Sequence, residues 1–283
     1  MSDIIFLNGN YLEKENATIS IMDRGFLFGD GVYELIPVYK GKPFLIDKHL
    51  SRLRSSLSLI GMKSDNEYIE NLSETLLELI KKNGYQDHFF YVQITRGFQA
   101  SRNHVYQEDV IPTILVMGEK YQIFPREKLS LGFNGCLQED FRWTKSNIKS
   151  ISLLGNVMLK NFASQNGFYE TLLIRDEKLT EGSASNVFIS KGQQVMTPNL
   201  GPDLLPGVTR DLLIDLLKQN GVEIKECDIS RKDLIDSDEV WCTSSTNYCV
   251  PIVEIDGKTI GSGKVGGNSF KSYDLITEFI SSL

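Results

Sequence analysis

The sequence predicts an α/β protein with two lobes. A chain of 283 residues is long enough for one large domain or two smaller ones. Stretches with apolar residues at helical spacing alternate with short apolar runs that suit strands. A charged, proline-containing segment separates two such groups, so we expect an N-terminal α/β domain over 1–118, an interdomain linker over 119–128 and a C-terminal domain over 129–283.

Composition narrows the class of protein. Hydrophobic residues make up 41% and charged residues 24% of the chain, as in ordinary globular proteins. A net charge of −7 argues against nucleic acid or an anionic membrane as the main partner. The N-terminus has no basic signal region and no apolar run approaches the roughly 18 residues of a membrane span, so we expect a cytoplasmic protein.

Cysteine and histidine usage gives no support to a metal centre. The three histidines are scattered, and the four cysteines are widely spaced with no C-x-x-C pair. We expect reduced thiols at Cys136, Cys227, Cys242 and Cys249.

The expected N-terminal domain starts with short strands at 3–7 and 17–22. A strand at 32–39 forms a hairpin with 44–46 across the turn at 41–43, and Asp47 caps a helix with an apolar stripe. Ser64 and Glu67 suit the capping box of a second helix, which ends at Gly84. Strands at 88–95 and 112–118 enclose the polar loop 96–104, and a long loop inside a sheet is often functional.

The expected C-terminal domain alternates in the same way. A helix covers 154–165, and apolar runs at 168–174 and 187–189 predict strands on either side of a turn that holds Glu181. A helix begins near Val208, a strand covers 239–243, and a last helix covers 268–283.

Two residues carry the chemistry in this interpretation, Lys149 and Glu181. Lys149 has apolar neighbours at an expected strand end before a helix, an environment that favours the neutral, nucleophilic amine. Glu181 lies in the turn-rich Thr-Glu-Gly-Ser segment between two strands, where a carboxylate can face a cleft. Taken alone, a solvated lysine and a hairpin glutamate explain both residues as well.

The surrounding motifs carry a resemblance. The segment from Arg142 and Trp143 to Ile148, Lys149 and Ser150, followed by Thr180-Glu181-Gly182 and Ser185-Asn186-Val187-Phe188, resembles the fold-type IV pyridoxal-phosphate enzymes, the class IV aminotransferases. The similarity runs from the first strand to the last helix. It implies a small N-terminal α/β lobe and a larger C-terminal lobe with a pseudo-barrel sheet that binds pyridoxal 5′-phosphate.

The resemblance also implies roles for single residues. Lys149 would hold the cofactor as a Schiff base and move the proton from the substrate Cα to the cofactor C4′, while Glu181 would face the pyridine nitrogen. Arg52, in the His49-x-x-Arg52-Leu53 motif, would bind the phosphate, and Leu205 would pack on the ring. Helix amides and hydroxyls would complete the phosphate site, from Val208, Thr209, Ser244 and Ser245. The alternatives at these positions are a solvated helix face, a threonine cap and a polar turn.

Substrate recognition is implied by a third group of residues. Tyr33, Arg102 and His104 resemble the carboxylate trap of the D-amino acid aminotransferases, in which the loop residues come from the neighbouring subunit of a homodimer. The loop is one residue longer after Gly97 than expected for that subfamily. The implied reaction is ping-pong transfer of the amino group from a D-amino acid, such as D-alanine, to a 2-oxo acid, such as 2-oxoglutarate.

Three other functions compete with this one. A branched-chain L-amino acid aminotransferase and an aminodeoxychorismate lyase would share the cofactor but not the Tyr33, Arg102 and His104 trio. A non-catalytic protein that binds a phosphorylated metabolite would need neither Lys149 nor Glu181.

Overall fold

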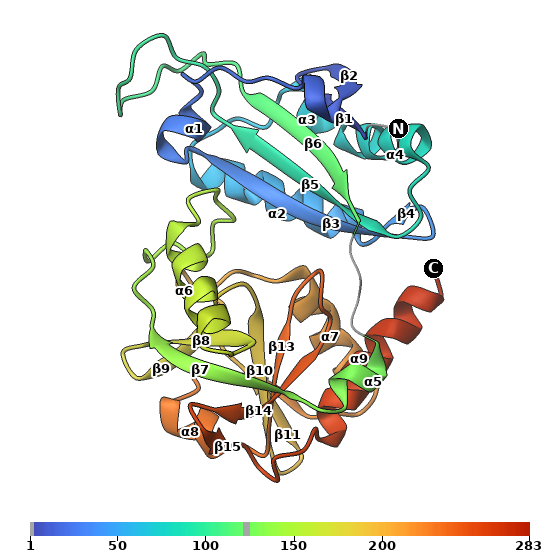
Figure 1. Cartoon of the computed structure of the whole chain (residues 1–283), viewed down its shortest axis with the longest axis vertical. Coiled ribbons are helices and arrows are strands. Elements are labelled where there is room, and N and C mark those ends of the chain that lie inside the picture. Colours follow the sequence, from blue (N-terminus) through green and yellow to red (C-terminus); the bar gives the residue numbers. More distant parts are fainter. Residues whose placement is uncertain (1–2, 121–124) are drawn as a thin grey trace. The chain divides into compact units, whose positions relative to one another are not determined.

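The computed structural model describes residues 3–120 and 125–283 (Figure 1). The chain forms two compact units, the first made of Met1–Gln122 and Ile148–Leu153, the second of Ile123–Asn147 and Leu154–Leu283. The expected linker overlaps this boundary, although 121–124 lie outside the described residues and Arg126–Leu129 form the short helix α5.

The first unit is built on a six-stranded sheet with the strand order β2-β1-β6-β5-β3-β4. Neighbouring strands are antiparallel throughout. The strands are β1 Ile4–Leu7, β2 Asn10–Glu13, β3 Gly31–Tyr39, β4 Lys42–Pro43, β5 His88–Thr95 and β6 Thr113–Glu119.

Helices supply the rest of the core of this unit. They are α1 Arg24–Phe28, α2 Ile46–Leu59, α3 Glu67–Glu70 and α4 Leu72–Asn83, with a 3₁₀ turn at Lys14–Asn16. The apolar stripes of α2 and α4, including Leu53, Leu57 and Leu76, pack in one cluster with Ile36 and Phe90 of the sheet. Helical spacing in the sequence located both stripes, because it records which face of each helix is buried.

Four local expectations for this unit are wrong. No strand forms at 17–22, and residues 10–13 pair with β1 instead. Leu45 precedes α2 in the left-handed conformation, so Asp47 lies inside the first turn and does not cap the helix. Asn66, not Ser64, caps α3 through a hydrogen bond from the Tyr68 N–H. The hairpin after β3 forms as expected, but its second strand is Lys42–Pro43, because Ile46 already begins α2.

Residues 148–153 join the first unit because they pair with the start of β3. The Tyr33 N–H donates to the Lys149 carbonyl at 2.9 Å, and the Ile151 N–H donates to the Gly31 carbonyl at 3.1 Å. Val32 and Ser150 form an isolated antiparallel bridge between these bonds. The expected boundaries assigned this segment to the C-terminal domain, since sequence order alone does not show which sheet a returning segment joins.

The second unit contains a curled, mixed nine-stranded sheet (Figure 1) with the order β12-β11-β10-β13-β14-β7-β8-β9 and β15 paired to β14. Its strands are β7 Phe133–Glu139, β8 Glu170–Arg175, β9 Lys178–Gly182, β10 Asn186–Lys191, β11 Gln194–Thr197, β12 Ile224–Glu226, β13 Glu239–Thr243, β14 Val250–Ile255 and β15 Lys258–Thr259. Leu172, Val187, Val240 and Ile252 from four of these strands share one apolar cluster.

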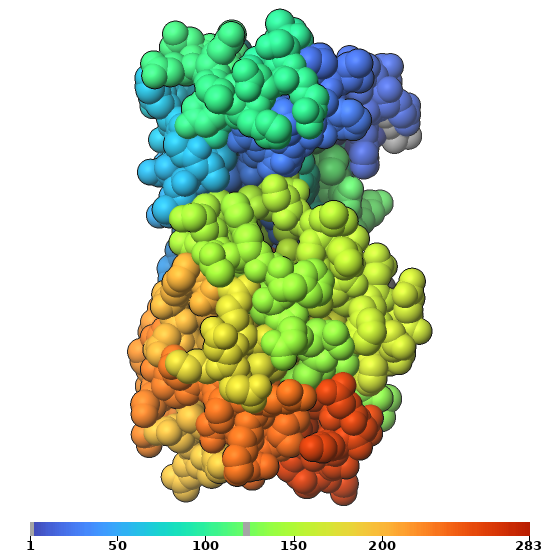
Figure 2. All heavy atoms as spheres, turned by 90° about the vertical axis from the view of Figure 1, so that its left-hand side faces the viewer, coloured from blue at the N-terminus to red at the C-terminus, as the bar shows by residue number. Residues whose placement is uncertain are grey.

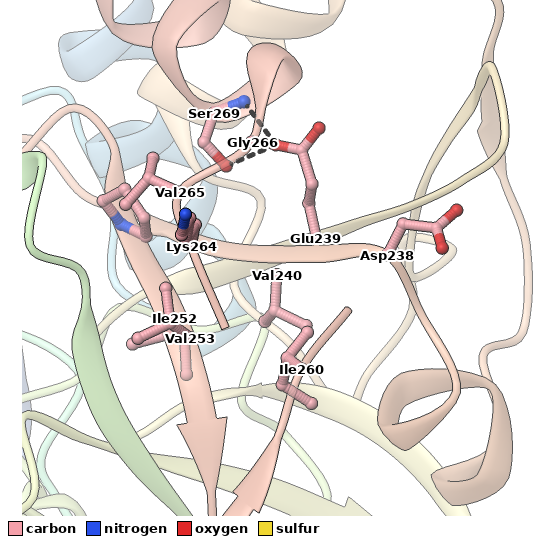
Figure 3. A pocket seen from close by; sticks show the side chains of 11 residues that line it. Asp238, Glu239, Val240, Ile252, Val253, Ile260, Lys264, Val265, Gly266 and Ser269 are labelled. Atoms are coloured by element: carbon pink, nitrogen blue, oxygen red, sulfur yellow. Dashed lines mark hydrogen bonds between the residues drawn. The ribbon is translucent and has the colours of Figure 1, made fainter. Parts of the chain in front are cut away.

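The helices of this unit after α5 are α6 Leu154–Gln165, α7 Val208–Gln219, α8 Arg231–Ile235 and α9 Gly267–Ser281. The start of α9 is fixed by Glu239 of β13 (Figure 3). Glu239 Oε1 accepts the Asn268 N–H at 3.0 Å, and Oε2 accepts the Ser269 N–H at 2.9 Å and its hydroxyl at 2.8 Å. A carboxylate at this place satisfies amides that have no partner within the helix.

The sequence located six elements of this unit, α6, α7, α9, β8, β10 and β13, and did not predict strands β7, β11, β12, β14 and β15 or helices α5 and α8. The bounds of α6 and β13 are those expected, α7 begins at Val208 as expected, and β8, β10 and α9 differ from the expected ranges at their ends. Glu181 is the exception, because it lies in strand β9 and not in a turn. None of the helices in the described parts of the chain is long and apolar enough to cross a membrane. All four cysteines are free thiols, and Cys227 alone of the four is partly exposed.

Candidate functional site

Lys149 lies beside β3 in the first unit, with its amine over the ring of Tyr33. Its backbone N–H donates to the Ser56 Oγ of α2 at 3.2 Å, which fixes the segment on its other side. The half-buried side chain places Nζ 4.1 Å from the centroid of the Tyr33 ring. Two residues expected to act together are therefore in contact.

The ring of Tyr33 also contacts Tyr91 on the neighbouring strand β5. The two ring centroids are 5.7 Å apart, and the Tyr91 hydroxyl donates to Gln93 Oε1 at 2.6 Å. Burial, with a smaller contribution from Tyr33, raises the pKa of Tyr91 to about 12, so the hydroxyl keeps its proton at neutral pH. The sequence analysis did not predict a role for Tyr91 or Gln93. The pairing of Tyr33 with Gln93 places these two side chains on the same face of the sheet, and this pairing is the signal that could have identified them.

Arg52 is held by Glu34, the residue that follows Tyr33 in β3. Its Nε and Nη2 donate to the two carboxylate oxygens at 2.7 and 2.8 Å. His49, one turn earlier in α2, places Nδ1 2.9 Å from Glu34 Oε2. The Glu34 side chain has 0% and the Arg52 side chain 9% of its surface exposed, so this ion pair is screened very little by water.

The charges in this cluster follow from its contacts. Burial alone would raise the pKa of Glu34, but the charge and hydrogen bonds of Arg52, together with His49, lower it to about 2. Burial lowers the pKa of His49, and the nearby Glu34 only partly opposes this shift. Neutral His49 then donates its Nδ1–H to the carboxylate. The sequence motif predicted a role for Arg52 but not for Glu34. The contact between a strand residue and a helix residue depends on how the two elements pack, which the spacing of neighbouring residues does not show.

Arg102 and His104 lie in the exposed loop between β5 and β6. The Arg102 guanidinium carbon is 4.9 Å from the Phe28 ring centroid, and the His104 ring is 5.2 Å from the same ring. Tyr33 makes its ring contacts with Tyr91 and Lys149 instead. Within one chain, the expected trio therefore belongs to two different aromatic clusters.

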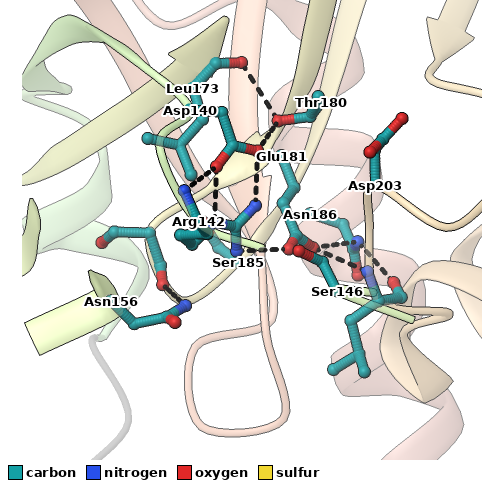
Figure 4. A network of polar contacts seen from close by, with 12 residues as sticks. Asp140, Arg142, Ser146, Asn156, Leu173, Thr180, Glu181, Ser185, Asn186 and Asp203 are labelled. Atoms are coloured by element: carbon teal, nitrogen blue, oxygen red, sulfur yellow. Dashed lines mark hydrogen bonds and ion pairs between the residues drawn. The ribbon is translucent and has the colours of Figure 1, made fainter. Parts of the chain in front are cut away.

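Glu181 is a buried carboxylate in the second unit (Figure 4). Its Oε1 accepts a hydrogen bond from Arg142 Nη1 at 2.7 Å. Its Oε2 accepts the Leu205 N–H at 3.0 Å and the Asn186 side-chain amide at 3.5 Å. The register of β9 against β8 shifts between Leu179 and Gly182, so Glu181 faces this polar network although Leu179, two residues earlier, joins the apolar core.

Asp140 organises Arg142 from its other side (Figure 4). Arg142 donates through Nε and Nη2 to the two Asp140 oxygens, each at 2.9 Å, and Thr180 adds a hydroxyl at 3.0 Å. Burial raises the pKa of Glu181 to about 7, because Arg142 shares its charge with Asp140 and offsets the burial only in part. Asp140 itself stays ionised, since hydrogen bonds and charge from Arg142 outweigh its burial and lower its pKa.

The N-terminus of α7 lies directly after this network. Gly207 precedes the helix, and no side chain caps it, so the expected alternative of an ordinary threonine cap is wrong. Val208 and Thr209 are both 5% exposed, at the positions where helix amides have no internal partner. A Cβ at Gly207 would come within 2.0 Å of Asn186 Oδ1, so the chain approaches the Glu181 network as closely as glycine permits.

Ser244 and Ser245 follow β13 next to the same network. Thr243 pairs with Asn186 across β13 and β10, so the serines leave the sheet beside the residue that contacts Glu181. Both are half-buried, and Ser244 Oγ accepts the Asn247 N–H at 3.0 Å. Thr243 Oγ1 is buried and has no hydrogen-bond partner within the described residues. The second unit thus gathers hydroxyls and helix amides beside one buried carboxylate. This arrangement suits a ligand with an anionic group at one end, bound by the hydroxyls and amides, and a cationic group at the other end, facing the carboxylate.

Comparison with protein families gives one match that covers most of the chain. The model of the family described as amino-transferase class IV matches residues 31–255. A D-alanine aminotransferase of Listeria monocytogenes serotype 1/2a (strain 10403S) is 39% identical over 264 residues, which cover 93% of this chain and 91% of the relative. A D-alanine aminotransferase of Bacillus licheniformis is 37% identical over 262 residues, 93% of this chain and 92% of its own length.

Solved structures share the fold. The branched-chain aminotransferase of the thermophilic archaeon Thermoproteus uzoniensis, solved with norvaline, superposes with a TM-score of 0.89 at 23% identity, over 100% of this chain and 96% of that one. The two-lobed α/β architecture expected from the sequence is therefore confirmed.

Proposed function

Because the chain belongs to the class IV aminotransferase family, we propose that it transfers the amino group of a D-amino acid, such as D-alanine, to a 2-oxo acid, such as 2-oxoglutarate. The cofactor is pyridoxal 5′-phosphate, on which the family depends. The observation that carries the proposal is the 4.1 Å contact between Lys149 Nζ and the Tyr33 ring, which joins the expected base to one member of the expected carboxylate trap.

The chain's own residues fit this cofactor. A phosphate dianion needs several N–H and O–H donors, and the uncapped amides of α7, the Thr209 hydroxyl and the unpartnered Thr243 Oγ1 are such donors among the described residues. Arg52, fixed along one edge by Glu34, adds a guanidinium. We assign the phosphate to Arg52, Val208, Thr209, Ser244 and Ser245, and the ring face to Leu205.

Bound pyridoxal phosphate supplies an electron sink that makes the Cα proton of an amino acid acidic. Lys149 would hold the cofactor through its amine, and its free Nζ would take the proton from the substrate Cα. The ring of Tyr33 then lies close enough to Nζ to stabilise the resulting ammonium.

Glu181 serves the other end of the cofactor. With a pKa of about 7 beside Arg142, it is half-ionised at neutral pH in the protein without cofactor. A protonated ring nitrogen next to Glu181 would lower that pKa and keep the carboxylate ionised. Arg142 and the Leu205 N–H hold the carboxylate in place, so it cannot turn away.

Tyr33, Arg102 and His104 would bind the substrate carboxylate, and this sets the stereochemistry. The base acts on one face of the cofactor, so the side on which the carboxylate is held decides which enantiomer presents its Cα–H to Lys149. Arg102 and His104 are exposed and lie in another aromatic cluster than Tyr33. We therefore propose that a second copy of the chain supplies them.

Exposed apolar side chains support a homodimer. On α6, Leu154, Val157, Met158 and Phe162 recur at helical spacing with exposed fractions of 74%, 50%, 56% and 38%. This part of the chain, yellow-green in Figure 2, lies at the surface. A second exposed set lies in the first unit and comprises Ile21, Phe26, Phe98, Val105 and Ile111. A stripe of exposed apolar side chains along one helix often marks an interface.

The rival functions of the same family differ in substrate. The branched-chain aminotransferase described above shares the fold at 23% identity, whereas the D-alanine aminotransferases are similar in sequence over almost the whole chain. A non-catalytic binding protein would have no use for an amine held over an aromatic ring.

The test is turnover of D-alanine with 2-oxoglutarate by purified protein loaded with pyridoxal phosphate. We expect pyruvate to form, and the Lys149→Ala variant to lose the activity by at least about a thousandfold, since tether and base disappear together. A Lys145→Ala variant is the matched control, because Lys145 is an exposed lysine four residues away. Equal turnover by the Lys149→Ala variant and the control would refute the assignment.

A further inference from the structure

Arg24 is a buried arginine that reaches into the loop between β5 and β6. It lies in the first turn of α1, and 4% of its side chain is exposed. Its Nη1 donates to the Asn103 carbonyl at 2.6 Å, and its Nη2 donates to the His104 carbonyl at 3.0 Å. The same guanidinium therefore fixes two consecutive peptide groups of a loop segment that forms no helix or strand of its own.

A charge cluster under the loop holds Arg24 in place. Arg24 Nε donates to Asp30 Oδ2 at 2.8 Å, and Arg96 Nε donates to the same oxygen at 2.9 Å. Arg96 also binds the Ile60 carbonyl at 2.8 Å, which ties the cluster to the end of α2. Burial alone would raise the pKa of Asp30, but hydrogen bonds and charges from Arg96 and Arg24 lower it, so Asp30 stays ionised between two cations.

Aromatic packing connects this cluster to the trap residues. The Arg24 guanidinium carbon lies 4.9 Å from the Phe28 ring centroid, and Arg102 lies at the same distance from that ring. The His104 ring lies 5.2 Å from the Phe28 ring, tilted by 39°. Arg96 lies 3.7 Å from the ring of Tyr106, at the far end of the segment. Arg24, Phe28 and Arg96 thus hold the loop on its buried side, while the side chains of Arg102 and His104 stay exposed.

The anchor of Arg24 is itself rigid. Asp23 precedes α1 and accepts hydrogen bonds from the Gly25 N–H at 2.7 Å and from the hydroxyls of Thr95 and Thr113 at 3.0 and 2.6 Å. The Arg24 N–H donates to the Gly97 carbonyl at 2.9 Å. Because these bonds join α1 to the ends of β5 and β6, the Arg24 side chain starts from a fixed point beneath the loop.

We propose that Arg24 is a positioning residue that preforms the carboxylate-binding loop, so that Arg102 and His104 are in place before substrate arrives. The proposal rests on the proposed function, which gives Arg102 and His104 their task. Arginine suits this position because its planar fork donates in three directions at once, to Asp30 and to two carbonyls, whereas lysine offers one nitrogen. A loop ordered in advance does not lose its conformational freedom when the substrate binds.

The experiment compares Arg24→Lys and Arg24→Gln with wild-type enzyme and with Arg54→Gln, a control that removes an exposed arginine of α2. We expect the KM for D-alanine to rise roughly tenfold or more in both Arg24 variants while kcat changes by less than about threefold, since substrate binding loses its ordered partner. With D-alaninol, which has a hydroxymethyl group in place of the carboxylate, the single-turnover rate should be the same in wild type and variants.

A second readout does not depend on catalysis. Trypsin cleaves after exposed arginines in mobile segments, and Arg102 is exposed in this loop. We expect Arg24→Lys, while folded by circular dichroism, to be cut between Arg102 and Asn103 at least about fivefold faster than wild type and Arg54→Gln, as measured by the mass of the fragments. The lysine variant keeps the positive charge, so it remains informative if Arg24→Gln does not fold.

The outcomes separate the two proposals. Unchanged KM for D-alanine and unchanged cleavage in folded Arg24→Lys would overturn the role of Arg24, with the proposed function intact. Equal losses with D-alanine and D-alaninol would also overturn it, because Arg24 would then support the fold and not the carboxylate site. Wild-type enzyme without activity on D-alanine would overturn the proposed function, and with it the task assigned to the loop.

Discussion

Glu181 is a carboxylate whose charge depends on what faces it. It is buried, and its nearest cation, Arg142, is already held in two hydrogen bonds by Asp140. Its pKa of about 7 is therefore well above its ordinary value near 4.5. A protein that needed Glu181 only for stability would have no reason to keep a buried carboxylate that gains a proton so readily.

This shift predicts how stability depends on pH in the cofactor-free protein. Because the folded state binds the Glu181 proton more tightly than the unfolded chain does, its contribution is complete below about pH 4.5 and is lost as the pH rises to about 7. Relative to Glu181→Gln, the wild type should lose roughly 3 kcal/mol of unfolding free energy over that range. Urea unfolding at a series of pH values measures this, with Glu278→Gln, an exposed glutamate of α9, as the control.

Loading with pyridoxal phosphate should remove most of this dependence, since a cationic ring nitrogen keeps Glu181 ionised in the folded state. Parallel curves for wild type and Glu181→Gln without cofactor would contradict the assignment of a raised pKa. The same pH dependence with and without cofactor would contradict the placement of the ring nitrogen at Glu181.

At the level of single residues, the sequence was informative wherever chemistry follows from a local motif. Lys149, Glu181 and Arg52 stand in such motifs, and the structure gives each of them a charged or aromatic partner. The partners Glu34, Tyr91 and Asp140 were not predicted. Their contacts depend on strand register and on helix-to-sheet packing, which connect residues far apart in the sequence.

The Glu34 cluster joins two elements, β3 and α2. A buried ion pair contributes little net stability, but removal of one partner leaves the other charge unpaired in the core. Glu34→Gln should therefore lower the free energy of unfolding by about 3 kcal/mol at pH 7. Glu70→Gln, at an exposed glutamate of α3, should have almost no effect in the same urea titration.

The pH dependence of this variant has the opposite sign to that of Glu181. With a folded pKa of about 2, Glu34 contributes stability that is present above its ordinary value and is lost as the pH falls toward 2. The difference between wild type and Glu34→Gln should thus shrink in acid. A difference below about 1 kcal/mol at pH 7 would show that the ion pair does not hold β3 to α2.

Among the elements, long periodic segments were predictable and caps were not. The bounds of α6 and β13 agree with the periodicity of the sequence, because the burial of one face requires apolar residues at regular spacing. The start of α2 does not, since Leu45 adopts a left-handed conformation that residue preferences disfavour. Glu181 falls in a strand because the Thr-Glu-Gly stretch of β9 pairs with β8, a contact that outweighs its turn-like composition.

For the molecule as a whole, the exposed stripe of α6 gives the clearest test of assembly. We expect sedimentation equilibrium to give twice the 32.0 kDa of one chain. Val157→Glu combined with Met158→Glu should shift the protein toward one chain, because two charges on a buried interface cost several kcal/mol. Gln219→Glu, at an exposed polar position of α7, is the control.

A double variant that keeps the mass of two chains would exclude α6 from the interface. A wild-type protein with the mass of one chain would contradict the homodimer. It would also contradict the proposal that Arg102 and His104 act in the site of a second copy. The cytoplasmic location expected from composition stays a prediction.

Comparison of D-alanine with L-leucine as the amino donor tests the proposed function at its most specific point. Wild-type protein loaded with pyridoxal phosphate is assayed with 2-oxoglutarate and each donor in turn. We predict a kcat/KM for D-alanine at least about a hundredfold above that for L-leucine, because carboxylate placement decides which Cα–H faces Lys149. Faster turnover of L-leucine would keep the cofactor chemistry but contradict the carboxylate trap of Tyr33, Arg102 and His104.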